Sequence, residues 1–301
     1  MQRATSGVRW IAGSRWPRLA SEGASLHTSF APARRGDLDA RSRADEDPWT
    51  ETVIIESRLP WALLPDVETV LVVVPFACVV SLLAGLLATR LRRRGVPAPY
   101  TRKVFHFAIF SFAAVMHLWR GPAGVVTFGG VVAALVLYAT IRRNRLFYAL
   151  ARPSDAPRER LFVLAPLLST AAGGLLANAV FGPFAIVGYL VAGWGDALAE
   201  PVGTRWGRHR YRVHSMFGVA ATRSLEGSAA VLVAGAMAGF IGLVVLGVPH
   251  LAAIVVAGGV GLTGAVVEAL STHGVDNLTV QVAASGVAAY IVQSMLGVPV
   301  S

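Results

Sequence analysis

Residues 67–89, VETVLVVVPFACVVSLLAGLLAT, decide the fold class, because these 23 positions hold a single charged side chain, Glu68. An apolar run of about 20 residues is long enough to cross the hydrocarbon core of a bilayer as a helix. Seven further runs of this kind follow, over approximately residues 104–119, 122–141, 161–180, 183–202, 228–247, 250–270 and 280–298. The sequence therefore predicts an all-α fold, a polytopic membrane helix bundle of about seven to eight transmembrane helices.

The composition of the whole chain agrees with a membrane location. Of its 301 residues, 54% are hydrophobic and 15% are charged, at a mean hydropathy of +0.58, whereas a soluble domain carries about 25% charged residues. The formal charge of +10 comes almost entirely from arginine, since Lys103 is the one lysine. The arginines fall in short loops between apolar runs rather than on one basic module. We therefore expect lipid head groups or phosphate substrates as partners, and no nucleic acid.

The N-terminal part of the chain differs from the rest in composition and hydrophobic pattern. Residues 1–65 lack sustained hydrophobic periodicity and read as a disordered N-terminal tail, whereas residues 66–301 form the membrane domain. Residues 1–36 hold six arginines and one acid, Glu22, which is typical of an organellar transit peptide. An arginine bias with almost no lysine also suits a GC-rich bacterium. We therefore expect a bacterial inner membrane, with a plastid or other organelle membrane as the alternative.

The loops predict the orientation, because basic residues in short loops stay on the cytoplasmic side. Arginines crowd the loops 90–103, 142–160 and 203–223, whereas the alternate loops near residues 120, 180 and 248 contribute only Arg120. With eight spans, the three basic loops and the polar stretch 271–279 share one face. We expect this inside face to be cytoplasmic or its organellar equivalent.

Seven of the seventeen acidic residues lie beyond residue 68, and five of them fall at the inside ends of predicted spans: Asp196, Glu200, Glu226, Glu268 and Asp276. An ionisable group inside a spanning helix costs about 2.5 to 3.5 kcal/mol on insertion scales and usually has a function. Asp196 and Glu200 are four residues apart and share one helical face, from which two carboxylates can point at one cation. The alternative is ordinary juxtamembrane charge paired with a loop arginine.

The segment 195–228, GDALAEPVGTRWGRHRYRVHSMFGVAATRSLEGS, joins two of these acidic spans. It combines glycines, which permit close backbone approach, with arginines, whose forks match phosphate oxygens. The residues concerned are Gly195, Gly203, Gly207 and Gly227 with Arg205, Arg208 and Arg223. This combination suits a polyphosphate held with a divalent cation, although neither a Walker-type nor a kinase-type glycine-rich loop is present. A basic loop that touches anionic lipids is the alternative.

Three blocks of sequence resemble the polyprenol and phytol kinase family, which includes dolichol kinases and CTP-dependent diacylglycerol kinases and is distantly similar to phosphatidate cytidylyltransferases. The first is RKVFH at 102–106, the second runs from GDALA at 195–199 to SLEGS at 224–228, and the third is VEAL at 267–270 followed by DNLT at 276–279. The blocks stand in the family's order and at similar spacing, and they cover about residues 100 to 285.

The resemblance implies a lipid kinase-like domain that transfers the γ-phosphoryl group, usually of CTP, to the hydroxyl of a membrane-dissolved isoprenoid alcohol, such as phytol, farnesol or a polyprenol. Our hypothesis is that Asp196 and Glu226, with Glu200, hold Mg²⁺ while Arg205, Arg208 and Arg223 bind phosphate oxygens. The glycines named above belong to this cofactor-binding segment. The predicted catalytic residues are Asp276, Asn277, Glu268, Lys103 and His106, with Asp276 as first choice for the base. Lys103 also meets the topological demand for a basic residue at the start of an inside span.

Two positions depart from the family's pattern. Arg223 stands where the family commonly has lysine, and Gln281 stands where proline often follows the third block. The same residues are compatible with two other functions. A phosphatidate cytidylyltransferase-like enzyme would join CTP to a phospholipid on the same acidic face, and a non-enzymatic transporter would show inverted repeats, which the sequence does not display on inspection.

Overall fold

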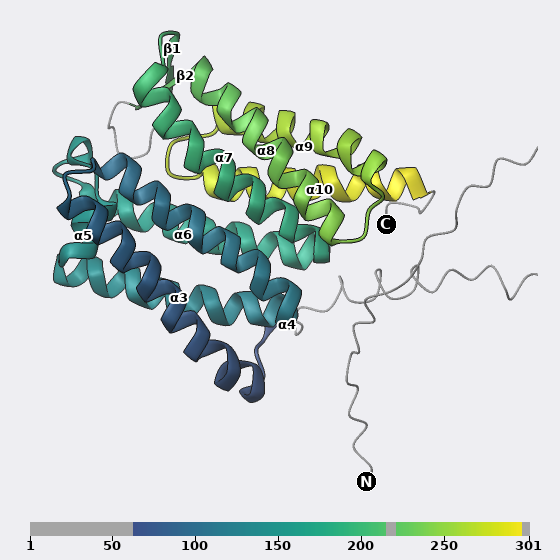
Figure 1. The fold of residues 1–301 in the computed structure, drawn as a ribbon, viewed down its shortest axis with the longest axis horizontal. Helices are drawn as coiled ribbons and strands as arrows, with labels where there is room; N and C mark the ends of the chain where they lie inside the picture. The colour runs from purple at the N-terminus through teal and green to yellow at the C-terminus, as the bar shows by residue number, and fades with distance from the viewer. Residues whose placement is uncertain (1–62, 215–220, 297–301) are drawn as a thin grey trace, which may run out of the picture. The chain divides into compact units, whose positions relative to one another are not determined.

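The computed structural model describes residues 63–214 and 221–296, which are almost entirely helical (Figure 1). Most of the predicted tail, residues 1–62, lies outside the described residues. The helices are α3 (Val67–Arg93), α4 (Ala98–Arg142), α5 (Arg145–Leu150), α6 (Glu159–Phe181), α7 (Ala185–Trp206), α8 (Leu225–Val245), α9 (His250–Leu270) and α10 (Asp276–Leu296). Two 3₁₀ turns, η2 (Pro153–Asp155) and η3 (Gly182–Phe184), and two strands, β1 (Arg210–Val213) and β2 (Ala221–Ser224), complete the described elements.

Helix α4 crosses the membrane twice. Its 45 residues would reach about 67 Å if they were straight, roughly twice the thickness of a hydrocarbon core. The helix breaks at Arg120 and Gly121, where Gly121 adopts a positive φ of 64° just before Pro122. The Thr101 hydroxyl then donates to the Ala149 carbonyl at 2.6 Å, so the start of α4 lies beside the helix that follows its end (Figure 1). Each half of α4 is therefore one crossing.

Helices α6 and α7 form a second pair of crossings of this kind. Gly182 ends α6 with a φ of 52°, and the η3 turn reverses the chain. The reversal brings the Asn178 amide against the Tyr189 hydroxyl, eleven residues further on. Six helical stretches have the length and apolar composition of membrane spans, and two of them are these double crossings. The described residues therefore confirm the predicted membrane helix bundle, and the two reversals bring the number of crossings that fits their lengths to about eight.

The basic loops meet at one end of the bundle, as their arginines predicted. Arg152, between α5 and α6, contacts Glu200 at the end of α7 and His273 between α9 and α10. Arg223, on the strand before α8, donates to the Ser271 carbonyl at 3.0 Å. Arg120 pairs instead with Glu68 at the start of α3, at the opposite end. We call the end with the basic loops the inside end.

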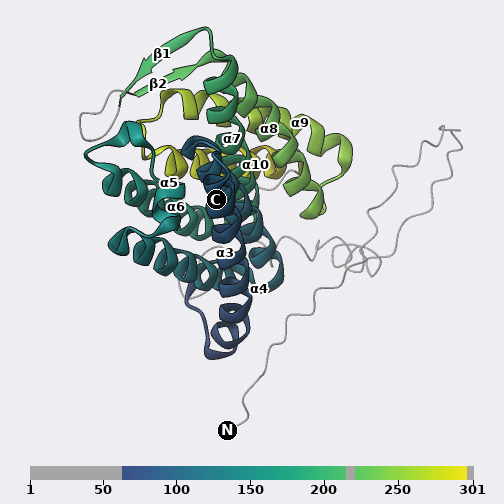
Figure 2. The ribbon, with the colours of Figure 1, turned by 60° about the vertical axis from the view of Figure 1, so that its left-hand side comes forward.

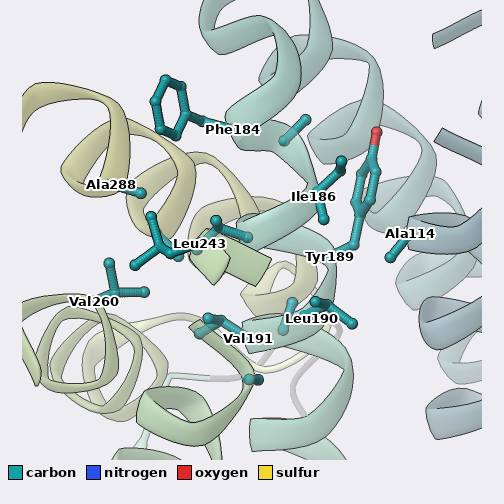
Figure 3. Close-up of a cluster of buried hydrophobic side chains, with 14 of the residues drawn as sticks. Ala114, Phe184, Ile186, Tyr189, Leu190, Val191, Leu243, Val260 and Ala288 are labelled. Carbon is teal, nitrogen blue, oxygen red and sulfur yellow. The ribbon is translucent and has the colours of Figure 1, made fainter. Parts of the chain in front are cut away.

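Helix α7 is the central element of the bundle. Its residues from Ala185 to Ala197 are buried almost without interruption, which is typical of a helix that is packed on all sides. Figure 3 shows Tyr189, Leu190 and Val191 of α7 among side chains such as Leu243 of α8 and Val260 of α9. Because α7 runs through the interior, the acids near its inside end lie among other helices and not against lipid.

The strands β1 and β2 form an antiparallel hairpin between α7 and α8 (Figure 2). In its register Tyr211 is opposite Arg223, and Arg210 is opposite Ser224. Ser224 then caps α8, because its hydroxyl accepts the Gly227 amide at 3.1 Å. The hairpin thus sets Arg223 at the inside end, immediately before the first turn of α8.

Candidate active site

A pocket of about 340 Å³ opens at the inside end, and ten charged side chains line it. Five are basic: Arg102, Lys103, Arg152, Arg210 and Arg223. Five are acidic: Asp155, Asp196, Glu200, Glu268 and Asp276. They come from α4, α7, α9, α10, the hairpin and the loop before α6. Segments that are far apart in the sequence therefore build one polar site at the ends of membrane-crossing helices.

Lys103 of α4 contacts two acids of α7. Its ammonium lies 2.5 Å from Asp196 Oδ1 and 3.3 Å from Glu200 Oε2, and the side chain is only 5% exposed. His106, one turn further along α4, brings Nε2 to 3.3 Å from the other Asp196 oxygen. The sequence predicted a metal ion at Asp196 and Glu200. In this structure both carboxylates contact the Lys103 ammonium, and a metal ion at these residues stays a prediction.

Arg223 joins the last turn of α9 to the first turn of α10. Its guanidinium lies 2.9 Å from Glu268 Oε1 and 2.9 Å from Asp276 Oδ2, and a third donor reaches the Ser271 carbonyl. The side chain is 11% exposed. A lysine ammonium has one nitrogen and does not span three acceptors in this arrangement. Arg223 therefore binds the three acceptors through three different nitrogens.

Asn277 and Gln281 form a second layer behind Asp276. The Asn277 amide donates to the Thr170 hydroxyl at 2.9 Å, and the Gln281 amide donates to the Asn277 carbonyl at 2.6 Å. A second cavity of about 10 Å³, which has room for one water molecule, is lined by Asp196, Glu268, Asp276 and Asn277 among apolar side chains. Three carboxylates from three helices thus border one small space.

Several predicted site residues lie away from the pocket lining. Glu226 pairs with His209, with Oε1 2.8 Å from Nδ1, and the exposed guanidinium of Arg205 stacks over Trp206. Arg208 is exposed as well. The cause for Glu226 is helix rotation: Gly227 faces α7, where an added Cβ would lie 3.0 Å from the Ala199 carbonyl oxygen, so the preceding side chain points about 100° away.

The four predicted glycines allow neighbouring helices to pack closely. Gly203 and Gly227 line the pocket. A Cβ on Gly203 or Gly207 would lie within 3 Å of the Ser224 hydroxyl, and one on Gly195 would lie 3.0 Å from Val231. Glycine at these positions lets the inside ends of α7 and α8 approach closely. Binding of phosphate by their backbone amides stays a prediction.

Arg152 is a site residue that the sequence reasoning missed. Its guanidinium bonds to Asp155 Oδ2 at 3.1 Å and Glu200 Oε1 at 3.1 Å, and lies 2.5 Å from His273 Nε2. Burial opposes the charge, but the two carboxylates outweigh it and raise the pKa of Arg152. Asp155 is one of the seven acidic residues beyond residue 68 and follows Arg152 by three positions. This spacing could have predicted the ion pair between the two residues.

His273 is the second missed residue. Burial, together with the adjacent Arg152 guanidinium, lowers the pKa of His273 to about 3. The imidazole is therefore neutral at physiological pH and can accept a hydrogen bond from Arg152. No pattern in the sequence connects the two residues, which are 121 positions apart.

The carboxylates of the site are the kind of ligand that Mg²⁺ prefers, and binding of the ion there stays a prediction. Within residues 63–214 and 221–296, no three His, Cys, Asp or Glu side chains stand close enough to cage a metal by themselves. Mg²⁺ usually takes one or two carboxylates, with substrate phosphates and waters as its other ligands. Asp196, Glu268 and Asp276 around the small cavity supply such oxygen donors.

Comparison with known proteins identifies one relevant relative. A phytol kinase of Synechocystis sp. (strain ATCC 27184 / PCC 6803 / Kazusa) is 34% identical over 190 residues, which cover 61% of this chain and 76% of that protein. No family model matches the chain, and no solved structure matches it.

Proposed function

The chain belongs to the polyprenol and phytol kinase family, and from this premise we propose that it phosphorylates a membrane isoprenoid alcohol with CTP and Mg²⁺. The observation that carries the proposal is the pocket: ten charged side chains converge at the inside end of membrane-crossing helices. A water-soluble nucleotide and a lipid hydroxyl can meet only at such an interface. The acceptor would be an alcohol such as phytol, farnesol or a polyprenol.

The charge of the pocket supports a metal-bound donor. Five basic and five acidic side chains line it, so their formal charges cancel although the whole chain carries +10. A bare triphosphate, with about four negative charges, would meet as many carboxylates as cations. A divalent cation removes part of that repulsion. The pocket is thus better suited to a magnesium-bound nucleotide than to a free one.

We propose the following division of roles. Lys103, Arg223 and Arg152 bind phosphate oxygens, and Asp196 with Glu200 would hold Mg²⁺, which neutralises charge on the phosphates when it is bound. Each of the three cations already holds carboxylates, so phosphate binding exchanges one set of anionic partners for another. Glu226, whose carboxylate is bound to His209, is left out of the metal pair.

Asp276 is our choice for the base. It borders both cavities, and Arg223 and the Asn277 amide hold its two carboxylate oxygens. The alcohol oxygen forms a bond to the γ-phosphorus as the bond from that phosphorus to the β-phosphate oxygen breaks, which yields the lipid phosphate and CDP. The alcohol proton passes to the Asp276 carboxylate. Glu268, beside Asp276 and tied to the same Arg223, orients this pair.

The test is a donor-by-acceptor screen with the purified full chain in detergent. We expect label from γ-³²P-CTP to enter phytol or another isoprenoid alcohol, to be lost with EDTA, and to return with added Mg²⁺. Label from α-³²P-CTP in the lipid, with release of pyrophosphate, would instead identify a cytidylyltransferase. Absence of any labelled lipid across all donors and acceptors would overturn the enzyme proposal.

We also propose that the chain resides in a bacterial inner membrane, with the pocket on the cytoplasmic side. The cyanobacterial origin of the relative and the arginine-rich inside loops support this location. Fluorescence of a reporter fused to the C-terminus, compared with a periplasm-dependent reporter, tests the orientation. A plastid membrane is the alternative.

A further inference from the structure

A second group of basic side chains lies at the inside end, outside the pocket lining. We define the arginine belt as six exposed residues at or directly after the ends of α3 and α4 and at the start of α5: Arg90, Arg93, Arg94, Arg142, Arg143 and Arg145. Helix α5 packs on α3, where Leu146 fills the space beside Gly85. The belt is therefore contributed by one packed sector of the bundle.

The charge of the belt is almost uncompensated within the described residues. Among 63–214 and 221–296, Arg143 has one acidic contact, with Glu159 at 4.0 Å, and the other five arginines form no ion pair. The pocket arginines differ, since Arg152 and Arg223 each hold two carboxylates. A concentration of unneutralised guanidiniums requires an anionic partner or free solvent.

The apolar surface next to the belt indicates which partner. Large apolar side chains are exposed beside the belt on the same helices: Leu86 and Leu87 of α3, one to two turns before Arg90 and Arg94, Tyr138 and Ile141 in the last turns of α4, and Tyr148 of α5. Exposed leucine and isoleucine on a membrane-crossing helix face acyl chains, and tyrosine is enriched at the head-group level. The guanidiniums therefore stand at the depth of lipid phosphates, and their long side chains can reach that level.

We propose that the arginine belt binds the phosphate groups of anionic phospholipids in the leaflet on the nucleotide side. A soluble phosphate would not contact the exposed apolar side chains next to the belt, whereas a lipid can contact both these side chains and the arginines. The geometry therefore favours a lipid. The binding has a structural consequence, because the Thr101–Ala149 hydrogen bond joins α5 to the start of α4, the segment that carries Lys103 into the pocket. Anionic lipid thus anchors the sector that supports Lys103.

The experiment uses the purified full chain in nanodiscs of phosphatidylcholine with increasing phosphatidylglycerol. Native mass spectrometry counts the phosphatidylglycerol retained, and the unfolding temperature is measured in parallel. For the wild type we expect preferential retention of phosphatidylglycerol and a rise in unfolding temperature with its fraction, both weakened by salt. Each arginine at the surface contributes about a fivefold preference. The quadruple variant R93Q/R94Q/R142Q/R145Q should lose at least about tenfold of that preference.

The matched control is R93K/R94K/R142K/R145K, which keeps the charge and the topological signal and should keep the lipid preference. Inorganic phosphate added to nanodiscs of pure phosphatidylcholine should not raise the unfolding temperature, and an equal rise would point to a soluble anion instead. Equal retention of both lipids by the wild type, or an unchanged preference in the folded glutamine variant, would overturn the proposal. Because these readouts involve no turnover, failure of the kinase proposal does not affect them.

Discussion

The pocket and the arginine belt use the same side chain in opposite ways. Arg223 is 11% exposed and donates to two carboxylates and a carbonyl, whereas Arg142 is exposed and has no acidic partner among the described residues. Both lie at the inside end, and both satisfy the same positive-inside rule. The difference teaches that the surroundings, and not the residue type or the loop, decide whether an arginine supports the site or faces the lipid surface.

The largest effect should follow from removing a pocket arginine. Arg223→Gln leaves Glu268 and Asp276, which are 8% and 14% exposed, without their shared cation. Loss of one partner of a buried ion pair destabilises by about 3 to 5 kcal/mol. Denaturant unfolding in a fixed detergent measures the change. Arg223→Lys should recover part of the loss, and equal stability of the glutamine variant and the wild type would contradict the described contacts.

The second effect concerns turnover. Asp196→Asn keeps the size of the side chain but removes the charge that lies 2.5 Å from Lys103. If this carboxylate holds the magnesium of the donor, transfer of label from γ-³²P-CTP to the lipid should fall by about 100-fold or more, as expected for loss of an electrostatic catalytic contact. Glu159→Gln, an acid of the inside end whose nearest partner is Arg143 at 4.0 Å, is the control. Full turnover by folded Asp196→Asn would remove the metal hypothesis.

A smaller effect should depend on pH. Because the pKa of His273 is about 3 in the folded protein, the unfolded chain alone takes up this proton as the pH falls below about 6.5. Stability from this group is therefore complete above pH 6.5 and declines toward pH 3, by up to about 2 kcal/mol at pH 5. Comparing unfolding at pH 7.5 and pH 5 in wild type and His273→Gln measures the contribution. Identical pH dependence in both proteins would show that His273 titrates normally.

The smallest effect is expected at the belt. Arg142→Gln removes an exposed charge with no acidic partner in the described part of the chain, so the free energy of unfolding in neutral detergent should change by less than about 0.5 kcal/mol. The comparison with Arg223→Gln under the same conditions is the decisive one. A loss at Arg142 as large as that at Arg223 would mean that the two regions do not differ in the way proposed.

Much of the fold was predictable because a segment that crosses a bilayer must be apolar and must form its backbone hydrogen bonds internally, as a helix does. Each apolar run near the predicted bounds is a helix, and the arginine-rich loops meet at one end. The runs that begin near 104 and 280 start one turn or more earlier, at Ala98 and Asp276, so Lys103 and Asn277 lie within helices. Hydropathy underestimates these ends, since polar side chains that face a site interrupt the apolar pattern without interrupting the helix.

The candidate site was predictable only in part. Asp196 and Glu200 share a face because helical spacing fixes their relation, and in the structure both contact the Lys103 ammonium. The direction of the Glu226 side chain could not be predicted from helical spacing, because it depends on how α8 is rotated by the contact of Gly227 with α7. The contact of Arg152 with His273 could not be predicted either, since it joins two loops that are separated by the four membrane crossings α6, α7, α8 and α9.

The sequence by itself determined the helical membrane fold, the charged end of the bundle and the identity of the scarce intramembrane acids, because each follows from the free energy of moving a local segment from water into lipid. The tertiary structure alone decided which acid meets which base and which arginines remain facing outward. Those pairings depend on the rotation and approach of helices from distant parts of the sequence, and no local free energy specifies that arrangement.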